Sequence, residues 1–271
     1  MIKLIACDMD GTLVCRDGRL PSDFASLLES MNADGILFAV ASGRPYRALY
    51  DIMSPFGENI IYISENGAYT RYKNEILLER TFDRGIIHRF ASYFNCMEHG
   101  FLAACGLKSY YINSHTPELL ASLDLFRIRY EAVDDLSEVD DDIFQLTVFF
   151  PGGINTVENI PLYHEFGDRY EFAITHTHWI DIYPKDVNKG AGLEAVYRKL
   201  DVTPEETCVF GDFFNDIPMF AKAEHSYCME SAPEAVKACA KHIVKGESGY
   251  AVTRTIKKIL WPQRNFNREN S

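Results

Sequence analysis

Two carboxylates, Asp8 and Asp10, follow a short apolar run at the start of the chain, and Gly11 comes directly after them. The run from Ile2 to Cys7 has the length and β-branched content of a buried strand. Because Gly11 permits a sharp turn, both carboxylates can converge at the carboxyl end of that strand, where open α/β sheets bind ligands. Neighbouring carboxylates repel unless a proton or a cation relieves them, and Mg²⁺ prefers oxygen ligands. The pattern predicts a magnesium site; a solvated acidic turn is the alternative.

Further polar side chains stand where an apolar run ends or a helix begins. Ser42 and Gly43 follow the apolar run 36–41 and precede Pro45, which favours a helix start and therefore a place for a phosphate. Asp212 and Asp216 follow the apolar run 207–210.

Two polar residues near predicted helix starts could have a structural role instead of a role in the site. Lys189 opens a predicted helix and could be an ordinary first-turn lysine, although a cation is locally unfavourable there. Asn215 could simply cap the helix that follows it.

Apolar runs at 2–7, 36–41 and 60–64 alternate with predicted helices that begin near residues 24 and 45. This alternation is typical of a doubly wound parallel sheet. It returns after residue 185 with a helix from 188, strands at 207–210 and 227–229, and helices at 232–240 and 249–260. We therefore predict an α/β fold in which residues 1–82 and 186–271 form a Rossmann-like core.

Residues 83–185 follow a different pattern and are predicted to form an inserted α+β domain. Its helices are expected at 83–98, 117–126 and 155–166, and its strands at 128–133, 143–150, 170–175 and 178–183, with a hairpin over 102–112. We expect these strands to form an antiparallel sheet with the helices on one face.

The composition restricts the partners. The chain has 271 residues, a formal net charge of -12 and a pI of about 5.1, which argues against non-specific binding to nucleic acid or to an anionic membrane. Its seven scattered cysteines are expected to be reduced thiols, and Cys7 belongs to the core because alternation turns it away from Asp8. Neither a signal peptide nor an apolar run of transmembrane length is expected, so we predict a cytoplasmic location. The sequence leaves open whether the protein is a monomer or a small homo-oligomer.

Five motifs occur in a fixed order: Asp8-Met9-Asp10-Gly11-Thr12, Ser42-Gly43-Arg44, Glu65-Asn66-Gly67-Ala68, Asn188-Lys189-Gly190, and Gly211-Asp212 followed by Asn215-Asp216. This order resembles the haloacid dehalogenase superfamily of phosphohydrolases, and in particular its Cof-type members, whose cap domain is inserted between the second and third motifs of the superfamily. The resemblance covers the whole chain and implies that residues 83–185 are that cap.

The resemblance implies catalytic roles. Asp8 would attack phosphorus and form an aspartyl phosphate. Mg²⁺ would be held by Asp8, by the backbone carbonyl of Asp10 and by Asp212, with Asp216 fixing the metal's waters or Lys189. The side chain of Asp10 would protonate the leaving oxygen and then take a proton from water. An acidic residue at position 10 also distinguishes the phosphatases of the superfamily from its dehalogenases.

The remaining site residues are expected to bind the substrate. Ser42 and the Gly43 amide would bind the phosphoryl oxygens, and Lys189 would stabilise their charge. Arg44 would reach the leaving group or the cap, or else form a surface salt bridge. Thr12 would orient Asp10. The expected substrate-binding set comprises Thr12, Gly43, Arg44, Asn188 and Asn215.

The predicted activity is magnesium-dependent hydrolysis of a small phosphorylated metabolite, such as a sugar phosphate, a nucleotide or a phosphorylated cofactor. There are two alternatives on the same scaffold: a phosphomutase, and a non-catalytic protein that binds phosphorylated metabolites. One departure from the superfamily pattern is the pair Phe213-Phe214, where a small polar residue usually comes first.

Overall fold

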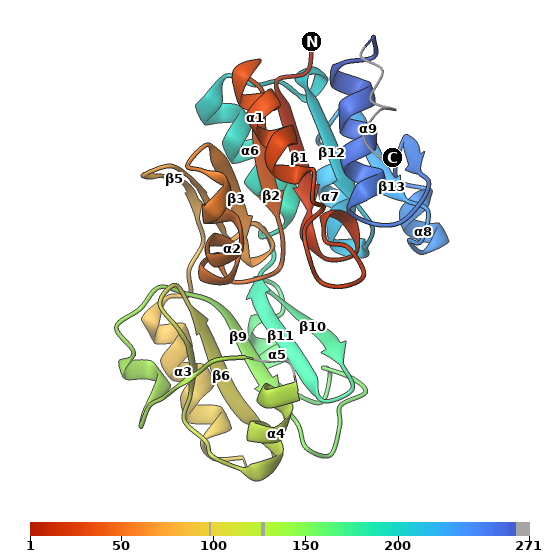
Figure 1. Ribbon diagram of the computed structural model, residues 1–271. Helices are drawn as coiled ribbons and strands as arrows, with labels where there is room; N and C mark the ends of the chain where they lie inside the picture. The colour runs from red at the N-terminus through yellow and green to blue at the C-terminus, as the bar shows by residue number, and fades with distance from the viewer. Residues whose placement is uncertain (98, 126–127, 264–271) are drawn as a thin grey trace. The chain divides into compact units, whose positions relative to one another are not determined.

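The chain builds two separate sheets and passes once from the first to the second and back (Figure 1). The computed structural model describes residues 1–97, 99–125 and 128–263, except for the side chains of Thr175 and His176. One compact unit is formed by Met1–Glu79 together with the chain from Asn188 onward, and the other by Arg80–Val187.

The first unit contains an eight-stranded sheet in the order β14-β13-β12-β1-β2-β3-β4-β5. Six strands run parallel: β1 (Leu4–Asp8), β2 (Leu37–Ala41), β3 (Ile60–Ser64), β12 (Thr207–Gly211), β13 (His225–Met229) and β14 (His242–Val244). β4 (Tyr69–Tyr72) and the edge strand β5 (Glu75–Glu79) run antiparallel to their neighbours.

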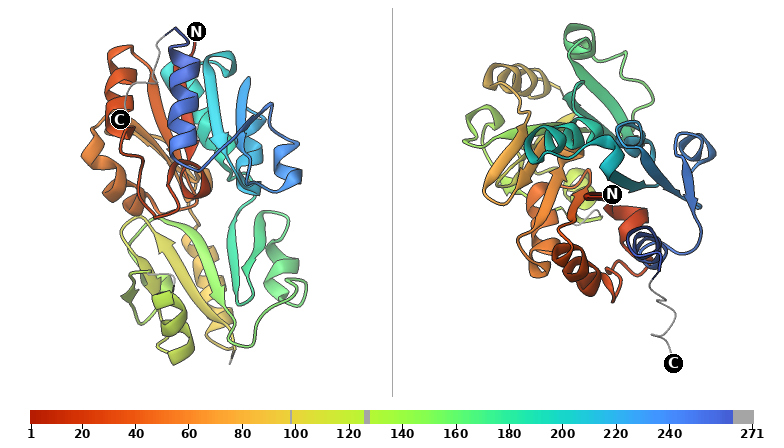
Figure 2. Two further views of the ribbon diagram at one scale, coloured as in Figure 1. Left: turned by 45° about the vertical axis from the view of Figure 1, so that its right-hand side comes forward. Right: turned by 90° about the horizontal axis from the view of Figure 1, so that it is seen from above.

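Helices cover both faces of this sheet. The apolar side chains of α1 (Phe24–Ala33), α2 (Tyr46–Met53) and α9 (Tyr250–Leu260) pack on one face. Those of α6 (Lys189–Leu200), α7 (Ile217–Phe220) and α8 (Glu234–Lys237) pack on the other. Seen from above, α1 in red and α9 in dark blue lie on one side of the sheet and α6 in teal on the other (Figure 2). This is the predicted α/β class with a doubly wound sheet.

The sequence did not predict three of these strands. β4 and β5 carry Arg71, Glu75 and Glu79, so they lack the continuous apolar run that marked the buried parallel strands. β14 has only three residues. β5 and β14 are the edge strands of the sheet and β4 lies beside β5, and strands in this position need not be apolar on both faces.

The second unit contains a six-stranded sheet in the order β10-β11-β9-β6-β7-β8. Its strands are β6 (Phe101–Gly106), β7 (Tyr110–Ile112), β8 (Glu131–Ala132), β9 (Ile143–Phe149), β10 (Tyr170–His176) and β11 (Trp179–Pro184). All neighbours are antiparallel except β7 and β8, which are parallel.

The prediction that all helices of this unit pack on one face of the sheet is wrong, because they pack on both faces. The helices α3 (Arg84–Phe94) and α5 (Pro161–Phe166) pack against Leu102, Ala104 and Val148. Helix α4 (Pro117–Leu125) packs against Ala103 and Phe149, which point to the opposite face because neighbouring residues alternate along a strand. The predicted end of α4 at 126 and of α3 at 98 fall on residues outside the described part of the chain.

Helix α5 is also shorter than predicted. It begins at Pro161 and not near residue 155. Proline lacks the N–H that would continue a helix through this point, and its ring disfavours the helical conformation of the preceding Ile160. Ile160 is extended, with φ -95° and ψ 113°.

Among the described helices, none combines the length and the apolar character needed to span a membrane. The seven cysteines are free thiols, and Cys7 is fully buried, as the alternation of β1 predicted.

Candidate active site

The functional side chains gather at the carboxyl edge of the first sheet because three adjacent parallel strands end there. β1 lies between β2 and β12, with Asp8 paired to Ala41 and Cys7 to Phe210. This register places Asp8, at the end of β1, between Ser42, which follows β2, and Asp212, which follows β12. Asp8 and Asp212, which are 204 positions apart, therefore meet at one edge of the sheet, where parallel strands bring their carboxyl ends together.

Three carboxylates form the centre of the site. Asp8, Asp212 and Asp216 each offer an oxygen, and these oxygens lie within 4.8 Å of one another. Asp216 is completely buried and Asp8 is 6% exposed. Burial raises the pKa of Asp8 to about 8, although the nearby Lys189 ammonium opposes the shift. Burial likewise raises the pKa of Asp212, against the hydrogen bond from Thr12.

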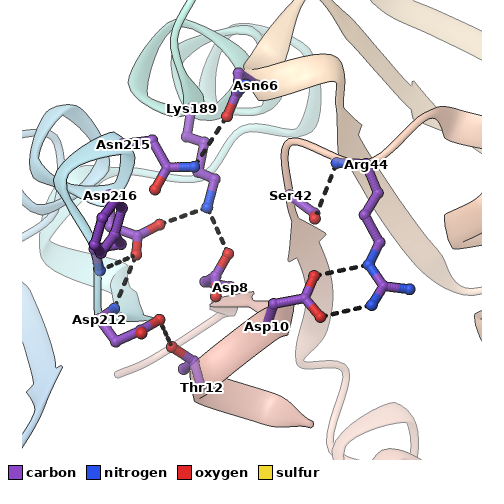
Figure 3. Close-up of polar contacts among 11 residues, drawn as sticks. Asp8, Asp10, Thr12, Ser42, Arg44, Asn66, Lys189, Asp212, Asn215 and Asp216 are labelled. Carbon is purple, nitrogen blue, oxygen red and sulfur yellow. Dashed lines mark hydrogen bonds and ion pairs between the residues drawn. The ribbon is translucent and has the colours of Figure 1, made fainter. Parts of the chain in front are cut away.

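Lys189 is the cation among these acids (Figure 3). Its Nζ donates to Asp8 Oδ1 at 2.5 Å and to Asp216 Oδ1 at 2.6 Å, and its side chain is completely buried. Burial lowers the pKa of Lys189, but the two carboxylates more than reverse this, so the pKa is raised. A lysine at the first position of α6 therefore owes its place to these carboxylates and not to the helix.

Asp216 fixes both the lysine and the loop that carries Asp212. While its Oδ1 accepts from Lys189, its Oδ2 accepts the backbone N–H groups of Asp212 at 2.8 Å and of Phe213 at 3.0 Å. A Cβ at Gly211 would approach the Asp216 carboxyl carbon to 2.5 Å, so only glycine fits beside it. Asp216 thus has protein donors at both oxygens.

Thr12 contacts Asp212 and not Asp10. The completely buried Thr12 donates its hydroxyl to Asp212 Oδ1 at 2.8 Å. The resemblance had implied that Thr12 orients Asp10, and substrate contact was expected. The structure pairs Thr12 instead with Asp212, which follows the adjacent strand β12. Gly11, at φ 83°, passes so close to Asp212 that a Cβ there would lie 2.3 Å from Oδ2.

Asp10 is bound by Arg44 through two hydrogen bonds. Arg44 Nε donates to Asp10 Oδ2 at 2.7 Å, and Nη2 donates to Oδ1 at 2.6 Å. The Asp10 side chain is 54% exposed and is not in the carboxylate cluster. Its hydrogen bond to Asp10 raises the pKa of Arg44. The backbone N–H of Arg44 also donates to Ser42 Oγ at 3.1 Å, so the second motif is tied to the first.

Asn66 is a site residue to which the sequence analysis gave no role. Its Oδ1 accepts from Asn215 Nδ2 at 3.0 Å, and its backbone N–H donates to the Ser42 carbonyl. Asn66 and its neighbours Glu65 and Gly67 all have positive φ, a strained turn that holds this amide over the end of β2. Its position directly after the third parallel strand was the signal that could have identified it.

Asn188 caps a helix in the structure, since its Oδ1 accepts from the Ala191 N–H at 2.9 Å at the start of α6. Asn215, which could have been a helix cap, bonds to Asn66 instead.

A cavity of about 460 Å³ opens above these groups. Its size is within the roughly 300–1,000 Å³ of small-molecule sites. Its lining is formed by Asp8, Asp10, Ser42, Gly43, Arg44, Asp212, Phe213 and Asn215. A buried carboxylate, a hydroxyl, a guanidinium and acids that could hold a metal thus surround one space, which fits the binding of a phosphate ester.

The chain belongs to the haloacid dehalogenase-like hydrolase family, whose pattern its sequence matches over residues 5–256. The resemblance drawn from the five motifs is thereby confirmed, and the chain is an enzyme of the hydrolase class.

Individual relatives are phosphatases by name. The 5-amino-6-(5-phospho-D-ribitylamino)uracil phosphatase YbjI of Escherichia coli K12 is 28% identical over 274 residues, which cover 98% of this chain and 99% of that protein. An HMP-PP phosphatase of Yersinia enterocolitica is 25% identical over 88% of this chain and 87% of its own.

A crystal structure from Eubacterium rectale has the same fold, with a TM-score of 0.87 and 28% identity over 95% of this chain and 99% of that one.

Proposed function

We propose that the protein is a magnesium-dependent phosphatase that hydrolyses a small phosphorylated metabolite through an aspartyl phosphate on Asp8. The observation that carries this proposal is the buried Asp8 carboxylate, which opens on the cavity and is held by Lys189 beside Asp212. An anionic nucleophile at the base of a cavity needs neighbouring cations before it can approach an anionic phosphate.

In the first step Asp8 attacks phosphorus, the bond from phosphorus to the leaving oxygen breaks, and Asp10 gives that oxygen a proton. In the second step Asp10 takes a proton from a water that attacks the aspartyl phosphate, which releases phosphate and restores Asp8. Ser42 and the Gly43 amide would bind the phosphoryl oxygens, and Lys189 would orient Asp8 and favour its ionised form against the effect of burial. Arg44 pairs with both oxygens of Asp10 in the substrate-free protein, so at least one of these hydrogen bonds would have to open before Asp10 can carry and transfer a proton.

The donor set fits a hard divalent cation. The acids Asp8, Asp212 and Asp216 supply only oxygen atoms, and their combined charge exceeds that of Lys189. Asp8, Asp212 and the backbone carbonyl of Asp10 would hold Mg²⁺, while Asp216, with protein donors at both oxygens, would position Lys189 and the loop. The bound cation would neutralise charge between the Asp8 carboxylate and the phosphoryl oxygens.

The unit Arg80–Val187 is proposed as the cap that selects the substrate, since a folded insert of this size suits small molecules. The named relatives act on small phosphorylated compounds, which supports the same class here.

A screen of phosphorylated metabolites for released inorganic phosphate tests the function. We expect turnover of at least one sugar phosphate, nucleotide or phosphorylated cofactor with Mg²⁺ and suppression by Ca²⁺, whose larger and looser coordination would misplace Asp8. Equal rates with the two ions would contradict the proposed metal geometry. Turnover that needs a bisphosphate activator would identify a phosphomutase, and binding without turnover would identify a non-catalytic protein.

The affinity for Mg²⁺ is expected to decrease as the pH falls. Because the pKa of Asp8 is raised to about 8 in the metal-free protein, Mg²⁺ must displace a proton from Asp8 at lower pH. The apparent affinity should fall as the pH drops below about 8 and become constant above it. Calorimetric titration at pH 7 in buffers of different ionisation enthalpy should show the release of nearly one proton. Binding without proton release at pH 7 would contradict the assignment of Asp8 as a ligand.

Gly11→Ala should weaken Mg²⁺ binding by displacing Asp212, since the new Cβ would lie 2.3 Å from its Oδ2. The expected loss is about 10- to 100-fold, as for other changes that disturb a metal ligand. Gly18→Ala is a matched control, because Gly18 has a similar φ of 80° and no atom within 4 Å of the added Cβ. Both variants should lose about 1–2 kcal/mol of stability through left-handed strain. Equal Mg²⁺ affinities of the two variants would show that the contact with Asp212 is unimportant.

A further inference from the structure

Two neighbouring phenylalanines are exposed beside the candidate active site. Phe213 is 55% exposed and Phe214 is 51% exposed, whereas every other phenylalanine in the described part of the chain is buried or half-buried. Exposed large apolar side chains that lie together usually mark a binding surface. The pair directly follows Asp212, so this apolar surface belongs to the same loop as a proposed metal ligand.

The backbone beneath the pair is tightly fixed. The N–H groups of Asp212 and Phe213 both donate to Asp216 Oδ2, and the chain before them passes Asp216 at Gly211 with no room for a Cβ. Phe213 has an extended backbone, with φ -129° and ψ 175°, which any residue adopts without strain. The ring of Phe213 therefore projects from a rigid support whose other function is to hold the acids in place.

Phe213 also lines the catalytic cavity. Among the described residues that form this lining it contributes the one large apolar surface, since the others are three aspartates, a serine, a glycine, an arginine and an asparagine. Asp212 lies on one side of Asp8 and the Asp10–Arg44 ion pair on the other (Figure 3). A phosphoryl group at Asp8 fills only part of the 460 Å³, so the remaining space must accept the leaving group.

We propose that Phe213, supported by Phe214, is a stacking surface for the leaving group, and that the substrates are phosphate esters whose alcohol carries a planar aromatic or heteroaromatic ring. This proposal rests on the proposed phosphatase function.

The two phenylalanine rings meet edge to face, with centroids 5.2 Å apart and an interplanar angle of 84°, which leaves about half of each side chain open. A flat ring laid on an aromatic face gains about 0.5–1.5 kcal/mol beyond the area that it buries, and an aliphatic group of equal size does not.

The test compares benzyl phosphate with cyclohexylmethyl phosphate. Both esters place a six-membered carbon ring one methylene from the oxygen, and their alcohols are of similar acidity, so they differ mainly in the flatness and π-electrons of the ring. With the full-length protein and Mg²⁺, we expect kcat/KM to favour benzyl phosphate by about five- to tenfold.

Three variants separate the contributions of the Phe213 and Phe214 rings to this preference. In Phe213→Leu, which keeps an apolar side chain but removes the ring, the ratio of the two kcat/KM values should fall to about one to two. Phe213→Tyr should retain the ratio of the unmodified protein. Phe214→Leu should reduce the ratio less than Phe213→Leu, because Phe214 does not line the cavity.

A ratio near one in the unmodified protein would overturn the stacking proposal, and so would a ratio that Phe213→Leu leaves unchanged. An equal loss for both esters would also overturn it, since the ring would then serve the fold, the second unit or another protein and not a planar leaving group.

Two further probes separate this proposal from the phosphatase function. Hydrolysis of acetyl phosphate, which has no ring, with a ratio near one for the two esters would overturn the stacking proposal alone. If no ester is hydrolysed, calorimetric binding of benzylphosphonate and cyclohexylmethylphosphonate still measures the ring preference without turnover. A preference for benzylphosphonate that disappears in Phe213→Leu would support the stacking surface while the phosphatase function fails.

Discussion

Asp8→Asn is expected to reduce phosphate release by on the order of 10⁴-fold or more, because loss of a catalytic nucleophile has effects of this size in other enzymes. Asparagine keeps the shape of the side chain but has neither the charge nor the nucleophilicity to form an acyl phosphate. The neighbours of Asp8 limit the structural consequences, since Lys189 still has Asp216 as a partner. Phosphate release from an aryl phosphate, together with a thermal unfolding curve, would measure the activity and the fold separately.

The matched control is Asp51→Asn, an exposed aspartate on α2, which should retain normal activity. Asp10→Asn should also abolish hydrolysis while the protein stays folded, because both steps would lose their proton donor and acceptor. Activity close to that of the unmodified protein in the variant at position 8 or at position 10 would remove the proposed mechanism.

Lys189→Met is expected to lower the free energy of unfolding of the metal-free protein by about 3–5 kcal/mol, the usual loss when one partner of a buried ion pair is removed. The substitution would leave Asp8 and Asp216 facing each other without the ammonium, in a site where Lys189 and Asp216 are completely buried. Denaturant unfolding measures this loss, and Mg²⁺ should restore part of it by supplying another cation.

Lys199→Met, on the same helix, is the control. Lys199 is 51% exposed and pairs with an exposed Glu75, so its loss should change stability by no more than about 1 kcal/mol. Equal losses of unfolding free energy in the two variants would show that Lys189 does not stabilise the buried carboxylates Asp8 and Asp216.

The stability of the metal-free protein should also depend on pH through Asp8. The pKa of Asp8 is raised from 3.8 to about 8 on folding, so between these values the folded chain holds a proton that the unfolded chain releases. The contribution of this group is complete below the ordinary pKa and is lost as the pH rises through about 8. The Lys189→Met defect should therefore be larger at pH 9 than at pH 6.

The part of the fold that the sequence predicted well is the buried parallel sheet. The strands at 60–64 and 207–210 were predicted to within one residue, because a strand buried on both faces must be apolar along its length. The edge strands β5 and β14, and β4 beside β5, were not predicted, because their partly exposed residues need not be apolar. The arrangement of helices in residues 83–185 was not predicted correctly. The face of the sheet on which α4 packs depends on its contacts with Ala103 and Phe149 and not on the sequence of the helix alone.

By itself, the sequence determined which chemical groups are available at the carboxyl edge of the sheet and that the chain belongs to this hydrolase family. Parallel strands bring their ends to one edge whatever the intervening chain does, so Asp8, Ser42 and Asp212 had to lie near one another once the order of strands was known.

Only the tertiary structure decided which of these groups bond to one another. Thr12 meets Asp212 across 200 residues, Asn66 meets Asn215 across 149, and Arg44 takes both oxygens of Asp10. Several hydrogen-bond donors and acceptors lie close together at this edge of the sheet. Their spacing along the sequence does not predict which donor pairs with which acceptor. The close approach of Asp212 to Gly11 and of Asp216 to the buried Gly211 fixes the positions of these carboxylates and so decides which partners they reach.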